Sequence, residues 1–164
     1  MKDITDVEYN DDGQIIDCLS GSAIKDTPEE RVRQRFIKIL QSDYGYPKDC
    51  ILREIPVQSG SSILTNESDG SPIRADIVVY KDKKAALKKD QGNILFVVEC
   101  KKPNVTEGYA QLVSYIFNTS AIGGVWTNGE GISVYKKTKD GIGLEEILSL
   151  PRYRENWQDE DAIP

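Results

Sequence analysis

The chain has 164 residues, a formal net charge of −6 at pH 7 and no histidine. This length predicts a single domain with a substantial core. The missing histidine excludes Ser-His-Asp and Cys-His nucleophilic sites and the common histidine zinc sites. Without a GxxxxGK[ST] or GxGxxG segment, the chain itself is not expected to bind a nucleotide.

Side chains that remain available for chemistry are carboxylates, lysine, glutamine and tyrosine. Carboxylate oxygens suit a hard cation such as magnesium. No apolar run approaches the length of about 18 residues that a membrane span needs, and the N-terminus lacks the apolar core of a signal peptide. The three cysteines are widely separated and form no zinc pattern. These features favour a cytoplasmic protein without a membrane segment.

The N-terminal part predicts a short strand or hairpin at 14–19 and then a helix over 27–44. Thr27 can cap this helix, and Pro28 fits its first position. Glu30 follows Thr27 at the spacing of a capping box, so we expect it to act as a structural cap. Glu29 projects toward the apolar stripe of the helix and is predicted to be the inward acid, which would need a partner or a metal.

Extended and polar segments alternate through the middle of the chain. We expect a turn at 45–49, a strand at 51–58, an exposed hairpin loop at 59–71, a strand at 73–80, a lysine-rich loop at 81–89 and a strand at 94–102. Pro56 places the first of these strands at a sheet edge, because proline cannot donate to a strand ladder.

The C-terminal part predicts a second long helix at 105–118, whose expected core face is Tyr109, Leu112, Val113, Ile116 and Phe117. A hairpin over 123–135, turned at Asn128-Gly129, follows it, and then a last short strand or turn at 147–151. Residues 155–164 are interpreted as an acidic tail or linker start beyond a single domain of residues 1–154. The order of elements favours an α/β fold, a mixed β-sheet flanked by helices.

Charged residues interrupt the two most apolar strands. Glu99 and Lys101 follow the apolar run 94–98, and Asp76 lies inside the earlier strand. Side chains alternate along a strand, so Glu99 and Lys101 share one face at about 6 to 7 Å, while Cys100 points to the other. The resulting pattern, Asp, 22 intervening residues and then Glu-x-Lys, is the spacing of a metal-dependent phosphodiesterase site on two neighbouring strands.

Each residue of this pattern also has a simpler explanation. Asp76 alone could be a strand-end acid that binds backbone amides, and Glu99 with Lys101 could be a salt bridge on one face of a strand. Gln111 could be a solvated helical residue, and Tyr115 could belong to the core. Between 74 and 102 the chain holds eight basic and four acidic residues. This basic excess could surround a phosphate site or form a solvated loop.

Taken together, the motifs resemble the PD-(D/E)xK nuclease superfamily and, within it, the N-terminal nuclease domain of type I restriction enzyme R subunits. The resemblance spans roughly residues 14–150, in the expected order. It is carried by the segments Thr27-Pro-Glu-Glu-Arg-Val-Arg-Gln34, Gly45-Tyr-Pro47, Arg74-Ala-Asp76, Val98-Glu-Cys-Lys-Lys-Pro103, Gln111-Leu-Val-Ser-Tyr115 and Thr127-Asn-Gly129.

This resemblance implies a restriction-endonuclease-like fold and a magnesium site, with manganese as a possible substitute. The implied ligands are Asp76, Glu99 and the backbone carbonyl of Cys100. Lys101 would orient or activate the attacking water. The resemblance further implies that Gln111 and Tyr115 contact DNA or support the site, and that Glu29 is an additional carboxylate.

The resemblance also implies partners. These are DNA, a C-terminal ATP-dependent translocase, and methylation and specificity subunits of a restriction-modification assembly. Nothing in this chain corresponds to the translocase. Two alternatives keep the fold: a catalytically idle module for DNA docking or subunit assembly, and a junction resolvase or repair nuclease of the same superfamily.

Overall fold

A six-stranded mixed sheet forms the centre of the computed structural model, which describes residues 3–59 and 62–153. The strand order is β10-β9-β8-β7-β6-β3, and β7 with β8 is the parallel pair among five neighbouring pairs. The strands are β3 (Ile51–Pro56), β6 (Arg74–Tyr80), β7 (Ile94–Cys100), β8 (Gly123–Thr127), β9 (Ile132–Lys137) and β10 (Leu144–Ile147). All seven residues of β7 are buried. The predicted mixed α/β fold is confirmed.

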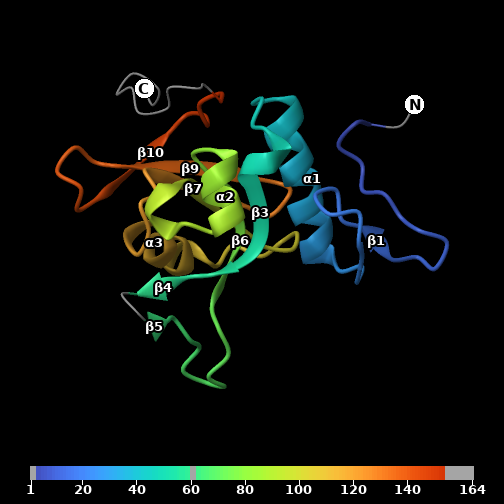
Figure 1. The fold of residues 1–164 in the computed structure, drawn as a ribbon, viewed down its shortest axis with the longest axis horizontal. Helices are drawn as coiled ribbons and strands as arrows, with labels where there is room; N and C mark the ends of the chain where they lie inside the picture. Colours follow the sequence, from blue (N-terminus) through green and yellow to red (C-terminus); the bar gives the residue numbers. More distant parts are fainter. Residues whose placement is uncertain (1–2, 60–61, 154–164) are drawn as a thin grey trace.

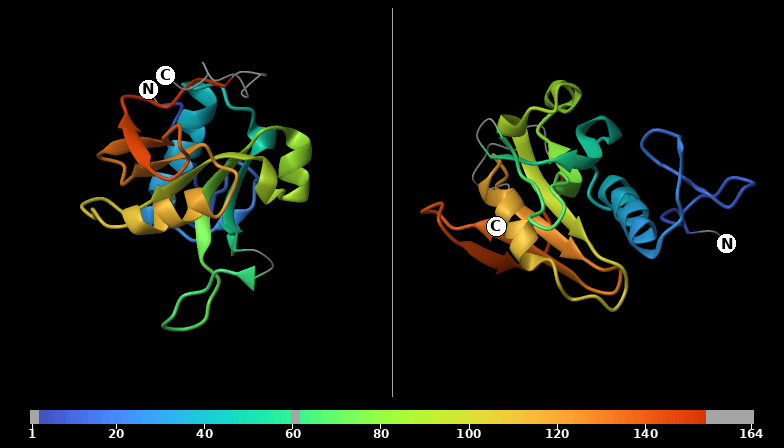
Figure 2. Two further views of the ribbon diagram at one scale, coloured as in Figure 1. Left: turned by 90° about the vertical axis from the view of Figure 1, so that its left-hand side faces the viewer. Right: turned by 90° about the horizontal axis from the view of Figure 1, so that it is seen from below.

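Helices cover both faces of this sheet. α1 (Pro28–Ser42) and α3 (Tyr109–Phe117) lie on opposite sides of it (Figure 2). α1 contributes Phe36, Ile37 and Leu40 to one apolar cluster, and α3 contributes Leu112 and Ile116 to the other. The sheet therefore has a core on each face, and the parallel β7–β8 connection runs through α3.

The start of α1 follows the predicted capping chemistry. The Thr27 hydroxyl accepts the Glu30 backbone N–H at 3.0 Å, and Pro28 occupies the first helical position. The helix ends at Ser42, two residues before the predicted end. Outside α1 lies a small hairpin of β1 (Ile15–Ile16) and β2 (Ala23–Ile24), which confirms the predicted N-terminal hairpin (Figure 1).

The β3 strand lies at one edge of the sheet, as Pro56 predicted. Beyond it, β4 (Gln58–Ser59) pairs with β5 (Ser62–Ile63) in a hairpin that projects from the body of the domain (Figure 1). The polar segment that was predicted as an exposed hairpin loop thus has a short ladder at its base. Two single-turn 3-10 helices, Lys48–Cys50 and Gln91–Asn93, precede β3 and β7.

Three predicted elements need correction. The lysine-rich segment is not a loop but contains α2 (Lys83–Lys88), because Asp82 caps it at the Ala85 N–H and two alanines bury its inner face. α3 begins at Tyr109 rather than 105. The last strand, β10, ends at Ile147, where the prediction began. The β8–β9 hairpin agrees with the prediction, including its turn after Thr127.

Two predictions concern properties of the whole chain. None of the helices in the described ranges is long and apolar enough to cross a membrane. The predicted acidic tail at 155–164 lies outside the described residues, and so the proposed boundary at residue 154 stays a prediction. Cys18, Cys50 and Cys100 all carry free thiols.

Candidate active site

Asp76 and Glu99 lie at the point where the β6–β7 ladder opens. The last pair of this antiparallel ladder is Ile77 with Val98, and the two acids are the next residues on each strand. There the Asp76 side chain replaces a backbone acceptor, because its Oδ2 accepts the Cys100 N–H at 2.8 Å. Both acids are buried, at 6% and 4% exposure. The sequence prediction that they lie on neighbouring strands is confirmed.

Glu99 has an unusual environment for a carboxylate. Its Oε1 lies 3.5 Å from Lys101 Nζ, while its Oε2 is buried and has no hydrogen-bond partner among the described residues. Burial and the neighbouring Asp76 charge raise the pKa of Glu99 to about 9. A positive charge next to Glu99 would favour its ionised form and offset this effect.

Lys101 connects this acid pair to α3. Its ammonium donates to Gln111 Oε1 at 3.1 Å, so the predicted catalytic lysine contacts one of the predicted supporting residues. Tyr115 is buried, and its hydroxyl donates to the Arg74 carbonyl at 3.2 Å, at the start of β6. Burial raises the Tyr115 pKa, and the Glu99 and Asp76 charges raise it further. Tyr115 thus acts as a neutral hydrogen-bond donor.

The buried face of α3 differs from the prediction. Leu112, Tyr115 and Ile116 are its buried residues, whereas Tyr109 and Phe117 are exposed. A helix that begins at 109 has only about two and a half turns. Its first and last aromatic side chains lie beside Tyr135 and Lys137 of β9 and keep part of their surface exposed. Tyr115 therefore belongs to the core, and its hydroxyl also binds the backbone at the start of β6.

Gly108, the N-cap of α3, controls the space around Lys101. Its φ is +111°, a value that favours glycine. A Cβ at this position would lie 2.7 Å from Lys101 Cε and 3.3 Å from Glu99 Cγ. Trp126 fixes the preceding residue, because its indole N–H donates to the Glu107 carbonyl at 2.8 Å. The Lys101 stem consequently packs against bare backbone.

The two adjacent glutamates of α1 exchange the positions that were predicted for them. Glu30, expected to be only a cap, is 6% exposed, whereas the Glu29 side chain is 43% exposed. The reason is that the buried face of the helix is rotated toward Arg33, Gln34 and Ile37. The Glu30 carboxylate does not close a capping box. Glu29 instead lies at the rim of the site, where burial and then the Asp76 charge raise its pKa.

Arg33 is the functional candidate that the sequence analysis missed. Its Nη2 lies 2.5 Å from Asp76 Oδ1, and its Nη1 binds Glu30. Glu54 and Glu29 lie 3.4 and 3.7 Å from the same guanidinium. A signal did exist, because Glu30, Arg33, Gln34 and Ile37 follow the i, i+3, i+4, i+7 spacing of one helix face. Three polar residues in that stripe indicated a buried polar network.

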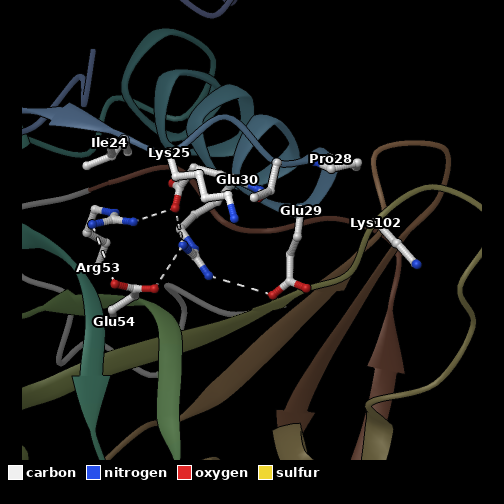
Figure 3. A pocket seen from close by; sticks show the side chains of 10 residues that line it. Ile24, Lys25, Pro28, Glu29, Glu30, Arg53, Glu54 and Lys102 are labelled. Carbon is white, nitrogen blue, oxygen red and sulfur yellow. Dashed lines mark hydrogen bonds and ion pairs between the residues drawn. The ribbon is translucent and has the colours of Figure 1, made fainter. Parts of the chain in front are cut away.

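A cleft of about 590 Å³ opens beside this network (Figure 3). Its wall combines the start of α1 with charged side chains of β3 and of the segment after β7. Glu29, Glu30, Arg53, Glu54 and Lys102 all face it in Figure 3. Lys25 and Lys102 are both exposed and form no ion pair with another described residue. The cleft therefore offers two free ammonium groups along its wall.

The acid pair fits a magnesium ion in its donor chemistry. The Oε2 of Glu99 has no hydrogen-bond partner among the described residues, and one or two carboxylates completed by water or phosphate is the usual protein contribution to a magnesium site. The described residues contain no group of three acidic, cysteine or histidine side chains arranged for a metal. Cys100, whose carbonyl the resemblance added as a ligand, is the last residue of β7. The ligand set stays a prediction.

These features define a class. A mixed sheet flanked by helices, with an Asp and a Glu-x-Lys at the open end of two neighbouring strands, is a restriction-endonuclease-like fold. The model of the family "Type I restriction enzyme R protein N terminus" matches residues 28–151, and the chain belongs to this family. No curated protein and no solved structure matches the chain.

Proposed function

We propose that this chain is the magnesium-dependent DNA endonuclease domain of a type I restriction R subunit. The observation that carries the proposal is the buried, unpartnered Oε2 of Glu99 next to Asp76, with Lys101 at 3.5 Å. A buried carboxylate oxygen without a partner costs free energy unless a ligand compensates it. Family membership supports the same reading, since the matched segment is the R subunit N terminus.

In this proposal Asp76 and Glu99 would hold the cation, with manganese as a possible substitute. The bound ion supplies positive charge for the phosphate oxygens and lowers the pKa of water. Lys101 orients the attacking water and can exchange a proton with it at Nζ. Gln111 fixes the Lys101 ammonium from α3, and Tyr115 supports the start of β6.

The charges of the domain bear on its partners. A net charge of −6 does not favour strong DNA binding by this chain, although Lys25 and Lys102 face the cleft next to the acids. We propose that most of the DNA grip comes from the larger assembly, which would include an ATP-dependent translocase and the methylation and specificity subunits.

The test is nicking of supercoiled plasmid in the presence of magnesium, with the R subunit in its assembled complex. Glu99→Ala should abolish nicking, because it removes the buried carboxylate whose Oε2 is free to bind the cation. Glu146→Ala is the matched control, an exposed glutamate on β10, and should cleave like the wild type. Undiminished nicking by the Glu99→Ala protein would refute the assignment and favour the idle-module alternative.

A further inference from the structure

Arg33 links three elements through a line of alternating charges. Its guanidinium binds Asp76 of β6 at 2.5 Å and Glu30 of α1, and Arg53 of β3 binds the same Glu30 oxygen. Glu54, also on β3, lies 3.4 Å from Arg33 and 3.6 Å from Arg53. Figure 3 shows the ion pairs of Arg53 with Glu30 and Glu54 along the wall of the cleft. The Arg33 side chain is only 7% exposed, so its charge is committed to these acids.

The backbone of Glu54 shows that this network is firmly determined. Glu54 has a φ of +52°, although it is neither glycine nor in a turn but inside β3. A left-handed residue other than glycine is strained and persists when its surroundings fix it. The contacts of its carboxylate with both arginines are the interactions that can do so. The guanidinium of Arg33 is thus fixed before any ligand binds.

The consequence for Asp76 is that donors hold both of its oxygens. Arg33 binds Oδ1, and the Cys100 N–H binds Oδ2 at 2.8 Å. A carboxylate offers about four lone-pair directions, so each oxygen keeps one for a cation. Without Arg33, the Cys100 N–H would be the one remaining donor to the Asp76 carboxylate among the contacts of the described residues. A single hydrogen bond does not fix the plane of a carboxylate, so Asp76 could adopt a different orientation.

We propose that Arg33 is a positioning residue, which fixes the plane of the Asp76 carboxylate so that its free lone pairs face the same space as Glu99. The proposal rests on the proposed function for its relevance to cleavage. Arg33 has no role as a ligand or as a proton donor in it. The competing explanation is that Arg33 only neutralises the buried negative charge of Glu30.

A charge-balanced double variant separates the two explanations. Arg33→Met with Glu30→Leu removes both charges of one buried pair and keeps apolar volume, an exchange that is often neutral for stability. Arg53 retains Glu54 as its partner. If compensation is the whole role of Arg33, this variant regains both stability and site geometry. If Arg33 positions Asp76, stability returns and the geometry does not.

The Cys100 amide reports the geometry without metal or DNA, because its N–H donates to Asp76 Oδ2. We expect its hydrogen exchange, measured by NMR on the stable double variant, to accelerate by about tenfold or more. The chemical shift of the Cys100 amide in the double variant should move toward the value that the same amide has in the Asp76→Ala protein. The Lys101 amide is the matched control, because it donates to the Thr127 carbonyl at 2.9 Å and should stay protected. A Cys100 amide that stays protected would overturn the proposal.

A second double variant keeps the test decisive if the Arg33→Met, Glu30→Leu protein does not fold. Arg33→Gln with Glu30→Gln is also uncharged and can still form a hydrogen bond within the pair; the same readout applies. In the assembled enzyme, kcat should fall by about tenfold or more with KM for DNA unchanged, as expected for a misplaced ligand group. Arg33→Lys should recover part of kcat. A wild-type enzyme that does not cleave DNA would refute the proposed function. The role of Arg33 is decided separately, by the hydrogen exchange of the Cys100 amide in the double variant.

Discussion

Replacing Glu30 with alanine should destabilise the domain far more than the loss of a helix cap. Its buried carboxylate binds both Arg33 and Arg53 and accepts from Gln34 at 3.2 Å. Removing one partner of a buried ion pair costs about 3 to 5 kcal/mol, because the remaining charge stays in the interior. Each arginine keeps a second carboxylate, at 2.5 Å for Arg33 and 3.6 Å for Arg53, so we expect the lower end, about 3 kcal/mol.

The neighbouring Glu29 supplies the control on the same helix. Its carboxylate is 43% exposed and lies 3.7 Å from Arg33, so Glu29→Ala should cost less than about 1 kcal/mol. Thermal unfolding measures both variants. For a domain of this size about 3 kcal/mol corresponds to a decrease in Tm of about 6 to 12 °C. Equal Tm values for the two variants would refute the assignment of Glu30 as the buried anchor.

Three further predictions concern the acid pair and its surroundings. Lys101→Ala should slow cleavage by about 10² or more while magnesium binding, measured by calorimetry, persists; lost binding would contradict an orienting role. Because burial and Asp76 raise the pKa of Glu99 from 4.5 to about 9, the folded protein holds the extra proton, and metal-free stability should fall as the pH rises through this range. Glu99→Gln should flatten that pH dependence, and a steep slope in this variant would disprove the cause. Gly108→Ala should reduce cleavage by displacing the Lys101 stem, whereas Gly131→Ala, where a Cβ meets open space, should not.

Patterns that depend on neighbours in the sequence predicted the fold well. The buried β7, the edge position of β3 and the Thr27 cap follow from apolar runs, one proline and local capping chemistry. α2 was missed because lysines dominate its sequence, although Asp82 and the two alanines favour a capped helix. The start of α3 was misplaced because a backbone with positive φ at Gly108 has no periodic signal.

The candidate site was predictable only in part. The strand pattern placed Asp76, Glu99 and Lys101 together, because a two-strand motif fixes spacing. The roles of Glu29 and Glu30 were reversed, because the rotation of α1 depends on what it packs against. Arg33 became visible only in three dimensions, since its partners lie on α1, β3 and β6.

Asp76 and Glu99, at the open end of the β6–β7 ladder, are both possible cation ligands, but they differ in how the protein itself binds them. Asp76 accepts from donors on both oxygens, so asparagine would turn an amide N–H toward one of them and alanine would leave the Cys100 N–H in the interior without an acceptor. The polypeptide itself therefore demands an acid at position 76, whether or not the domain cuts DNA. Glu99 leaves one oxygen without a protein partner. A substitution of Asp76 that abolishes activity could act through folding or through the chemical step. The identity of residue 99 is therefore the better marker of an active enzyme among variants of this domain.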